Sequence, residues 1–260
     1  MTDSSQGIAL VTGASRGIGR QIALGLIDAG HKVIAVSRNS FDTSGLTTQQ
    51  QSSIFSINGD VSDRLFVEKL AQQVSTEHGV VQILVNAAGV FGPFDLVQNT
   101  DPDEWAHTII IDAIAPYYTT RYFLPGMLSS KWGRIINVGS AASLHTPGPL
   151  YSAYGTAKVA LNQLTRQVAS EISGTGVTAN VIHPGEVQSD MWVDIQKKTA
   201  ALGEAGNNQQ VWVDWVDKTG GDDPKKASDL VLKLVSKESD EINGRFCWID
   251  EPLQAPIPSW

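Results

Sequence analysis

Tyr154 and Lys158 have the residue types and the spacing for acid–base chemistry. Residues four positions apart lie on the same face of a helix, so the phenol and the ammonium would lie side by side. A positive charge lowers the cost of forming a phenolate, so we expect it to bring the pKa of Tyr154 nearer to neutrality. The alternative is an amphipathic helix with a half-buried Tyr and a solvated Lys. Three other features of the chain favour the chemical interpretation.

The first is a glycine-rich turn between an apolar, β-branched run at Ile8–Thr12 and residues at helical spacing up to Gly30. A strand, a glycine turn and a helix let the backbone approach a pyrophosphate and direct a helix N-terminus at it. The spacing is one residue longer than in the commoner dinucleotide fingerprint, and a glycine triplet alone could be an ordinary turn. The candidate phosphate-binding residues are Gly13, Ser15, Arg16, Gly17, Ile18 and Gly19.

The second feature is the end of the next expected strand, Val33–Ser37. NAD-binding units carry a carboxylate there that accepts hydrogen bonds from the ribose 2′-hydroxyl. This chain has Ser37 and Arg38 instead, and Arg16 lies in the glycine turn. Two guanidiniums suit a 2′-phosphate, although each could also be a solvated surface side chain. The sequence therefore predicts NADP(H) as the cofactor.

The third feature is the regular alternation of strands with helices, which predicts a parallel sheet covered on both faces. Further strands are expected at 54–57, 83–85, 134–138, 177–182 and 245–249. A long helix is expected over 103–130, with a kink near Pro116 and a break near Pro125. Ligands bind beyond the carboxyl ends of such strands. We therefore expect one sheet edge to hold Gly13, Arg38, Asp60, Asn86, Ser140 and 184–185.

The composition excludes several classes of protein. Across 260 residues, 19 basic and 27 acidic side chains give a net charge of −8, which argues against binding to nucleic acid or anionic lipid. The single cysteine, Cys247, excludes an internal disulfide. The chain has no apolar run long enough to span a bilayer and no basic apolar leader, so we expect a cytoplasmic protein.

The chain has the length of one large α/β domain, and we expect residues 1–260 to form it. Residues 186–226 interrupt the alternation and are polar, yet they carry Trp192, Trp212 and Trp215. Tryptophan is enriched both in pockets and at interfaces. A lid over a site and an interface with another subunit both stay open for this segment.

Taken together, these motifs resemble the short-chain dehydrogenase/reductase family, in its single-domain branch, from Ile8 to about Ser189. This resemblance implies a Rossmann-type doubly wound parallel β-sheet with helices on both faces. The matching pieces are Thr12-Gly13-x-x-x-Gly17-x-Gly19, Asp60, Asn86-Ala87-Ala88-Gly89, Ser140, Tyr154-x-x-x-Lys158 and Pro184-Gly185.

The resemblance also implies a role for each matching residue. Tyr154 would donate a proton, Lys158 would support it and contact the nicotinamide ribose, and Ser140 would fix the substrate carbonyl. The other cofactor-binding positions would be Gly13 to Gly19, Ser37, Arg38, Asp60, Val61, Asn86, Ala87, Gly89, Pro184, Gly185, Val187 and Ser189. The substrate would contact Ser140, His145, Tyr151, Met191 and Trp192.

Two positions depart from the family pattern. Ala87 replaces a second Asn, which is a mild change. The family usually has an Asn seven residues after a Trp, and counting from Trp105 leads to Asp112, which we include among the catalytic candidates. Asp112 keeps the backbone carbonyl that is thought to hold a relay water. Its negative charge, however, would weaken the effect of Lys158 on Tyr154.

These observations predict an NADP(H)-dependent carbonyl reductase or alcohol dehydrogenase without a metal, acting on an aromatic or hydrophobic small molecule. The resemblance implies a homodimer or homotetramer. The alternative is a non-catalytic NADP(H)-binding sensor or scaffold, for which Asp112 is the one supporting feature.

Overall fold

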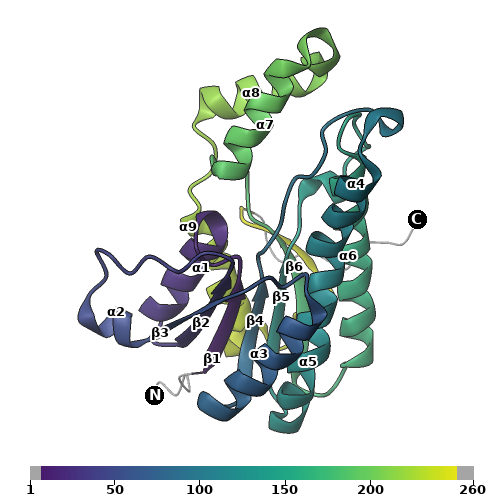
Figure 1. Cartoon of the computed structure of the whole chain (residues 1–260). Helices are drawn as coiled ribbons and strands as arrows, with labels where there is room; N and C mark the ends of the chain where they lie inside the picture. Colours follow the sequence, from purple (N-terminus) through teal and green to yellow (C-terminus); the bar gives the residue numbers. More distant parts are fainter. Residues whose placement is uncertain (1–6, 251–260) are drawn as a thin grey trace.

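A computed structural model describes residues 7–250, apart from the side chain of residue 208. Seven strands form one sheet in the order β3-β2-β1-β4-β5-β6-β7, with every neighbouring pair parallel (Figure 1). The strand order reverses between β1 and β4, so the predicted doubly wound, Rossmann-type fold is confirmed. The strands are β1 (Ile8–Thr12), β2 (Lys32–Ser37), β3 (Ile54–Asn58), β4 (Val81–Asn86), β5 (Gly133–Val138), β6 (Val177–His183) and β7 (Phe246–Trp248).

Helices cover both faces of the sheet because the strands are apolar on both sides. In β1, Ala9 and Val11 pack into one core cluster with residues of α1 and α9, whereas Leu10 packs into a second cluster with residues of α3 and α5. This near-continuous burial is typical of strands in parallel sheets. The helices around the sheet are α1 (Gly17–Asp28), α2 (Thr48–Ser52), α3 (Arg64–Glu77), α4 (Pro102–Ile109), α5 (Ala115–Ser130), α6 (Ser152–Glu171) and α9 (Lys225–Val235).

The long helix that the sequence predicts over 103–130 is irregular close to Pro116, where a kink was expected. A π-helical turn at Ile110–Ile114, η2, joins α4 to α5, and Pro116 lies in the first turn of α5. The predicted break near Pro125 is wrong, because α5 continues through this residue. Pro125 and Arg121 are both exposed, so the Arg121 carbonyl that loses its helical partner can face water.

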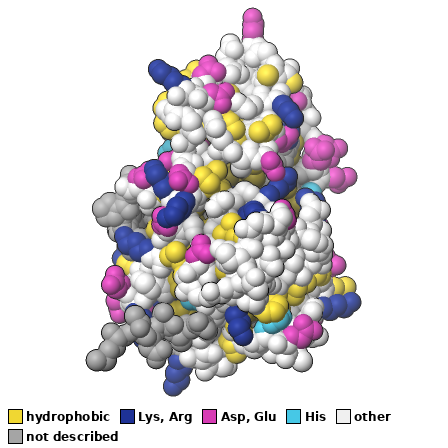
Figure 2. Space-filling model, turned by 90° about the vertical axis from the view of Figure 1, so that its left-hand side faces the viewer, with side chains coloured by type: hydrophobic (Ala, Val, Ile, Leu, Met, Phe, Trp, Pro, Cys, Tyr) yellow, Lys and Arg dark blue, Asp and Glu magenta, His cyan; other side chains and the backbone are white. Residues whose placement is uncertain are grey.

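Two further helices, α7 (Asp190–Ala201) and α8 (Asn207–Thr219), project beyond the carboxyl ends of the strands (Figure 1). Neither helix was predicted from the sequence. Trp192 of α7 packs edge-on against Trp212 of α8, with ring centroids 4.8 Å apart, and Val213 and Val216 complete this cluster. The space-filling view shows the pair as a lobe above the part of the molecule that contains the sheet (Figure 2).

Between residues 7 and 250, no helix has both the length and the apolar character needed to cross a membrane. The final strand β7 is shorter than the 245–249 expected from the sequence. The three prolines between Asp250 and Trp260 predict an extended tail, and residues 251–260 of it lie outside the described residues.

Candidate active site

Two adjoining cavities lie at the carboxyl edge of the sheet, beneath α7 and α8. The larger has a volume of about 690 Å³ and the smaller of about 230 Å³. Four residues line both of them: Ile18, Phe91, Ser189 and Met191. Because the two cavities share these walls, groups bound in one lie next to groups bound in the other.

The larger cavity fits a nicotinamide dinucleotide. Helix α1 begins at Gly17 on its wall, so the first backbone N–H groups of this helix are available to phosphate oxygens. Gly13 has a φ of +66°, and a Cβ there would lie 2.7 Å from the Cα of Ala88, so only glycine suits this turn. The predicted residues that line the cavity are Gly13, Ser15, Arg16, Gly17, Ile18, Gly19, Ser37, Arg38, Asp60, Val61, Ala87, Gly89 and Ser189.

Arg16 and Arg38 both line this cavity, but their surroundings differ. The Nη1 atom of Arg16 lies 2.8 Å from Oδ2 of Asp190, and both of these side chains are about two-thirds exposed, at 68% and 64%. An exposed ion pair of this kind contributes about 0–1 kcal/mol, so a phosphate can displace it. Arg38 lies close enough to Asp60 to lower the pKa of that carboxyl. Burial opposes this effect, but it is outweighed by hydrogen bonds from Ser62 together with the Arg38 charge.

Tyr154 and Ser140 line the smaller cavity, whereas Lys158 and Asp112 line neither cavity and lie buried behind them. The Nζ atom of Lys158, one helical turn after Tyr154 in α6, donates to the Val138 carbonyl at 3.0 Å and lies 3.0 Å from Oδ2 of Asp112. Ser140 follows β5, and its side chain lies close enough to Tyr154 to lower the pKa of the phenol in part. Oδ1 of Asp112 accepts the Val90 N–H at 2.8 Å, which fixes the carboxylate from the far side.

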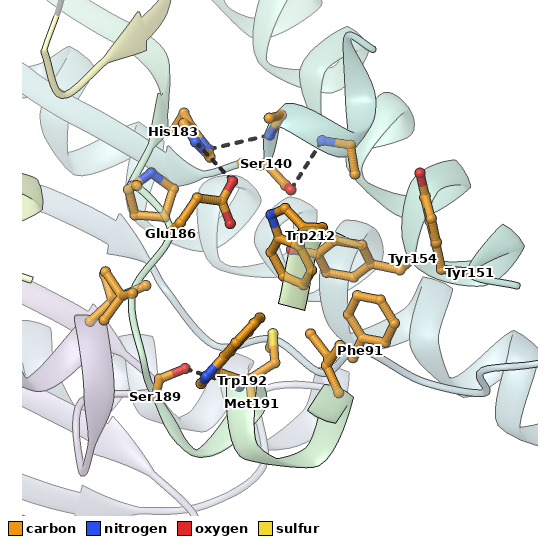
Figure 3. A pocket seen from close by; sticks show the side chains of 18 of the residues that line it. Phe91, Ser140, Tyr151, Tyr154, His183, Glu186, Ser189, Met191, Trp192 and Trp212 are labelled. Atoms are coloured by element: carbon orange, nitrogen blue, oxygen red, sulfur yellow. Dashed lines mark hydrogen bonds and ion pairs between the residues drawn. The ribbon is translucent and has the colours of Figure 1, made fainter. Parts of the chain in front are cut away.

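The smaller cavity is lined largely by aromatic and apolar side chains (Figure 3). Phe91 lies against Tyr154, with ring centroids 4.8 Å apart. Trp192 of α7 and Trp212 of α8 also line this cavity. All five predicted substrate residues line it: Ser140, His145, Tyr151, Met191 and Trp192. Pro184, Gly185 and Val187 also lie here, beside Tyr154.

A family model described as "short chain dehydrogenase" matches residues 7–200. The chain belongs to the short-chain dehydrogenase/reductase family. It is 30% identical over 253 residues to short chain dehydrogenase pigC of Monascus ruber, covering 94% of this chain and 78% of that protein. It is 31% identical to the 3-oxoacyl-[acyl-carrier-protein] reductase FabG of Vibrio harveyi, covering 91% of this chain and 93% of that one. Two other fungal short chain dehydrogenases are longer, and the chain spans 52% and 60% of them.

Among solved structures, the chain resembles the KRED1-Pglu enzyme with a TM-score of 0.81. The two chains are 27% identical, over 92% of this chain and 99% of the other. Family membership makes this chain an oxidoreductase that uses a nicotinamide cofactor. The residues that line the larger cavity are the ones that would hold it.

In this dehydrogenase, the pKa of Tyr154 is shifted in the direction opposite to the one expected from the sequence. Burial raises the pKa above the ordinary tyrosine value, while the charge of Lys158 and the hydrogen bond with Ser140 lower it only in part. The negative charges of Asp112 and Glu186 add to the rise. The expectation was wrong because it counted the cation and neglected the desolvation of the phenol. Tyr154 is therefore a protonated acid at neutral pH.

Asp112 of the dehydrogenase is fully buried beside Lys158, in the middle of the π-helical turn η2. Burial raises the pKa of its carboxyl, and the Lys158 charge and the Val90 N–H limit that rise. Burial lowers the pKa of Lys158 because it disfavours the charged form. The interactions with Asp112 and Tyr154 outweigh burial, so the pKa of Lys158 is raised overall. The two side chains thus form a buried ion pair, with exposures of 6% for Lys158 and 0% for Asp112.

The side chain of Asn86 lines neither of the two cavities, although the family resemblance implied a cofactor contact. Its amide donates to Oδ1 of Asn137 at 2.8 Å and accepts the Thr119 hydroxyl at 2.7 Å. Asn137 in turn donates to Thr165 at 2.8 Å. This buried network joins β4 and β5 to α5 and α6, so Asn86 helps to place α6, which carries Tyr154.

Several residues of the site were not predicted from the sequence. Lys198 of α7 and His107 of α4 line the larger cavity, and neither lies at a strand end, where site residues were sought. Trp212 was not assigned to the pocket because the helix that carries it was not predicted. Glu186 could have been found, since an acidic residue that directly follows Pro184-Gly185 lies at the ligand-binding edge.

Proposed function

We propose that this dehydrogenase reduces the carbonyl group of a ketone or aldehyde with NADP(H), with Tyr154 as the proton donor. The observation that carries the proposal is the placement of Tyr154 and Ser140 on the wall of the smaller cavity, with the Nζ atom of Lys158 5.5 Å from the centre of the Tyr154 ring. The bound cofactor supplies the hydride. Ser140 polarises the carbonyl oxygen, Tyr154 donates a proton to it, and Lys158 holds a positive charge nearby.

The protonation state of Tyr154 supports reduction as the favoured direction at neutral pH. A raised pKa keeps the phenol protonated and ready to donate a proton. Oxidation of an alcohol would need the phenolate as a base, which this environment disfavours. We further propose that residues 186–226 act as a lid, since Trp192 and Trp212 of this segment face the substrate pocket.

A substrate panel tests this function. Aromatic and aliphatic ketones, aldehydes and the matching alcohols are assayed with NADPH and NADH, or their oxidised forms, by the absorbance of the reduced nicotinamide. We expect turnover of hydrophobic ketones with NADPH. Cofactor binding without turnover on any compound would favour the alternative of a sensor or scaffold protein.

Arg38→Ala is expected to weaken NADPH binding by about 10- to 100-fold, or about 1.5–3 kcal/mol, the usual size for a hydrogen bond to a charged group. The affinity for NADH should hardly change, because NADH lacks the 2′-phosphate. Fluorescence titration of both cofactors measures the two constants. Arg121→Ala is the control, since it removes an exposed guanidinium from α5, which lines neither cavity. Equal affinity of the wild type for NADPH and NADH would contradict the proposed preference.

Asp112→Asn is expected to keep the enzyme active and to shift its pH profile. Removing the negative charge beside Lys158 lowers the pKa of Tyr154, so activity in the reductive direction should be lost at a lower pH than in the wild type. Turnover at neutral pH should change by less than about tenfold, as expected for a modest change in acid strength. The measurement is kcat/KM for a ketone from pH 7 to 11, so that the range extends above the ordinary pKa of tyrosine. A profile that does not move would show that Asp112 has no influence on the acid.

A further inference from the structure

The substrate pocket contains one carboxyl group, that of Glu186, and no positively charged partner for it. Among the described residues that line this pocket, Glu186 is the only acidic one, and none is Lys or Arg. Its side chain is 25% exposed. Figure 3 shows the carboxyl turned inward, toward Ser140 and Trp212. A carboxyl group in a pocket lined largely by aromatic side chains needs a physical reason, because burial of an unpaired charge is costly.

The backbone of Glu186 is held in place on both sides. Its N–H donates to Oδ2 of Asp222 at 2.9 Å, and its carbonyl accepts the Asp222 N–H at 3.0 Å. Lys226 pairs both with the Asp222 carboxylate at 3.0 Å and with Asp250 at 2.9 Å. The preceding Gly185 has a φ of +85°, and a Cβ there would lie 2.5 Å from Ile249. The direction of the Glu186 side chain is therefore set by the fold.

His183 does not neutralise Glu186, although its Nε2 atom lies 3.7 Å from Oε1. The Nδ1 atom of His183 accepts the Ala141 N–H at 3.2 Å, so the neutral ring carries its proton on Nε2. Burial lowers the pKa of His183 to about 4, which leaves the ring uncharged at neutral pH. Burial, with the nearby charge of Asp222, raises the pKa of Glu186 to about 7, against a hydrogen bond from Trp212. The ionised form of Glu186 therefore lacks a positive partner within the pocket.

The aromatic side chains that line the same pocket can hold a cation. Phe91 lies within 6.1 Å of Tyr151 and 4.8 Å of Tyr154, centroid to centroid, and Trp192 meets Trp212 edge-on. Aromatic faces attract ammonium groups, most strongly where water is excluded. An anionic substrate would be repelled by Glu186, and no Lys or Arg among the described lining residues would attract it.

We propose that the carbonyl substrate carries a protonated amine, which Glu186 binds as an ion pair among the aromatic side chains of the pocket. This inference rests on the reductase function proposed above and names its substrate class. The amine takes no part in the chemistry. The hydride and the proton still go to the carbonyl carbon and oxygen, so Glu186 determines specificity.

The test compares two aryl ketones of the same shape, one with a dimethylaminoalkyl chain and one with the branched alkyl chain that replaces nitrogen by carbon. At pH 8 the wild type should have a kcat/KM for the amine about 10- to 100-fold higher, the range expected for a charge-assisted hydrogen bond. Glu186→Gln should abolish this preference through KM and leave the neutral ketone within about threefold. Asp214→Asn is the control, because it removes an exposed carboxylate of α8 that lines neither cavity.

The preference should also increase from pH 6 to pH 8, as Glu186 ionises while the amine, with a pKa of about 10, stays protonated. The pKa values of the other groups that face Glu186 keep their charge constant in this range: His183 is neutral, Asp222 is ionised and Tyr154 is protonated. His145 also lines the pocket, and Glu186→Gln leaves it in place. The difference between the wild type and the variant therefore isolates Glu186.

Three outcomes would overturn the inference. Equal kcat/KM values for the two ketones in the wild type would leave the reductase function intact but remove the amine preference. If Glu186→Gln changed the affinity for NADP⁺ by the same factor as the KM for the amine, Glu186 would act on the oxidised cofactor and not on the substrate. If neither ketone is reduced, tryptophan fluorescence titration with the two alcohol products still compares binding, and equal affinities would reject the amine site.

Discussion

Tyr154→Phe is expected to lower turnover by at least about 10²–10⁴-fold, the typical contribution of a general acid. The substitution keeps the ring that packs against Phe91 and removes only the hydroxyl group. The loss can exceed this range, because the proposed mechanism has Ser140, Tyr154 and Lys158 acting as a unit, and such losses are not additive. The rate of NADPH oxidation with a saturating ketone measures the effect, and fluorescence titration checks that NADPH still binds.

Tyr151→Phe is the matched control within the same pocket. The Tyr151 hydroxyl accepts the Gly148 N–H at 3.0 Å, and the residue one helical turn later is Gly155, so no lysine supports this phenol. This variant should change KM at most and keep its turnover. Near-native turnover of Tyr154→Phe under the same conditions would show that the proton comes from another group.

Lys158→Met is expected to lower the free energy of unfolding by about 3–5 kcal/mol, because it leaves Asp112 as a buried charge without its partner. Adding Asp112→Asn should restore most of this loss, since the amide can still accept the Val90 N–H but carries no charge. Urea denaturation of the two single variants and the double variant gives the coupling energy of the pair.

This comparison separates stability from catalysis. Both variants that lack Lys158 should be poor catalysts, yet only the single variant should be strongly destabilised. A double variant no more stable than Lys158→Met would mean that Asp112 and Lys158 are not energetically coupled, despite the 3.0 Å between their charged atoms.

The parts of the fold that were predictable from sequence are those in which local pattern and burial agree. Ile8–Thr12 is apolar without interruption and is followed by a glycine turn, and the structure places β1 at the same residues. The hairpin of α7 and α8 has no such pattern, because its apolar contacts join Trp192 to Trp212 across a polar, acidic stretch. Pairing between residues so far apart is a tertiary property that a search for helical periodicity does not detect.

The candidate site was also predictable only in part from the sequence. The strand ends predicted that Gly13, Arg38, Asp60 and Ser140 would share one edge of the sheet, because the carboxyl ends of parallel strands meet there. That Tyr154 and Lys158 join Ser140 was implied by the family resemblance. The direction in which Asn86 points depends on the pleat at the end of β4, and the pKa of Tyr154 depends on burial; the spacing of residues reports neither. Glu186 was missed for a further reason, since the motif at Pro184-Gly185 was interpreted only through its expected cofactor contacts.

The neighbouring side chains His183 and Glu186 also link the stability of the fold to pH, and they do so in opposite senses. The pKa of His183 is depressed from 6.5 to about 4, so its contribution to stability is present above pH 6.5 and is lost as the pH falls through about 4. The pKa of Glu186 is raised from 4.5 to about 7, so its contribution is present below pH 4.5 and is lost as the pH rises through about 7. Between these limits each group changes the free energy of unfolding by about 1.4 kcal/mol per pH unit, with opposite sign. From about pH 4.5 to 6.5 the two contributions therefore cancel, and the pair leaves the free energy of unfolding unchanged.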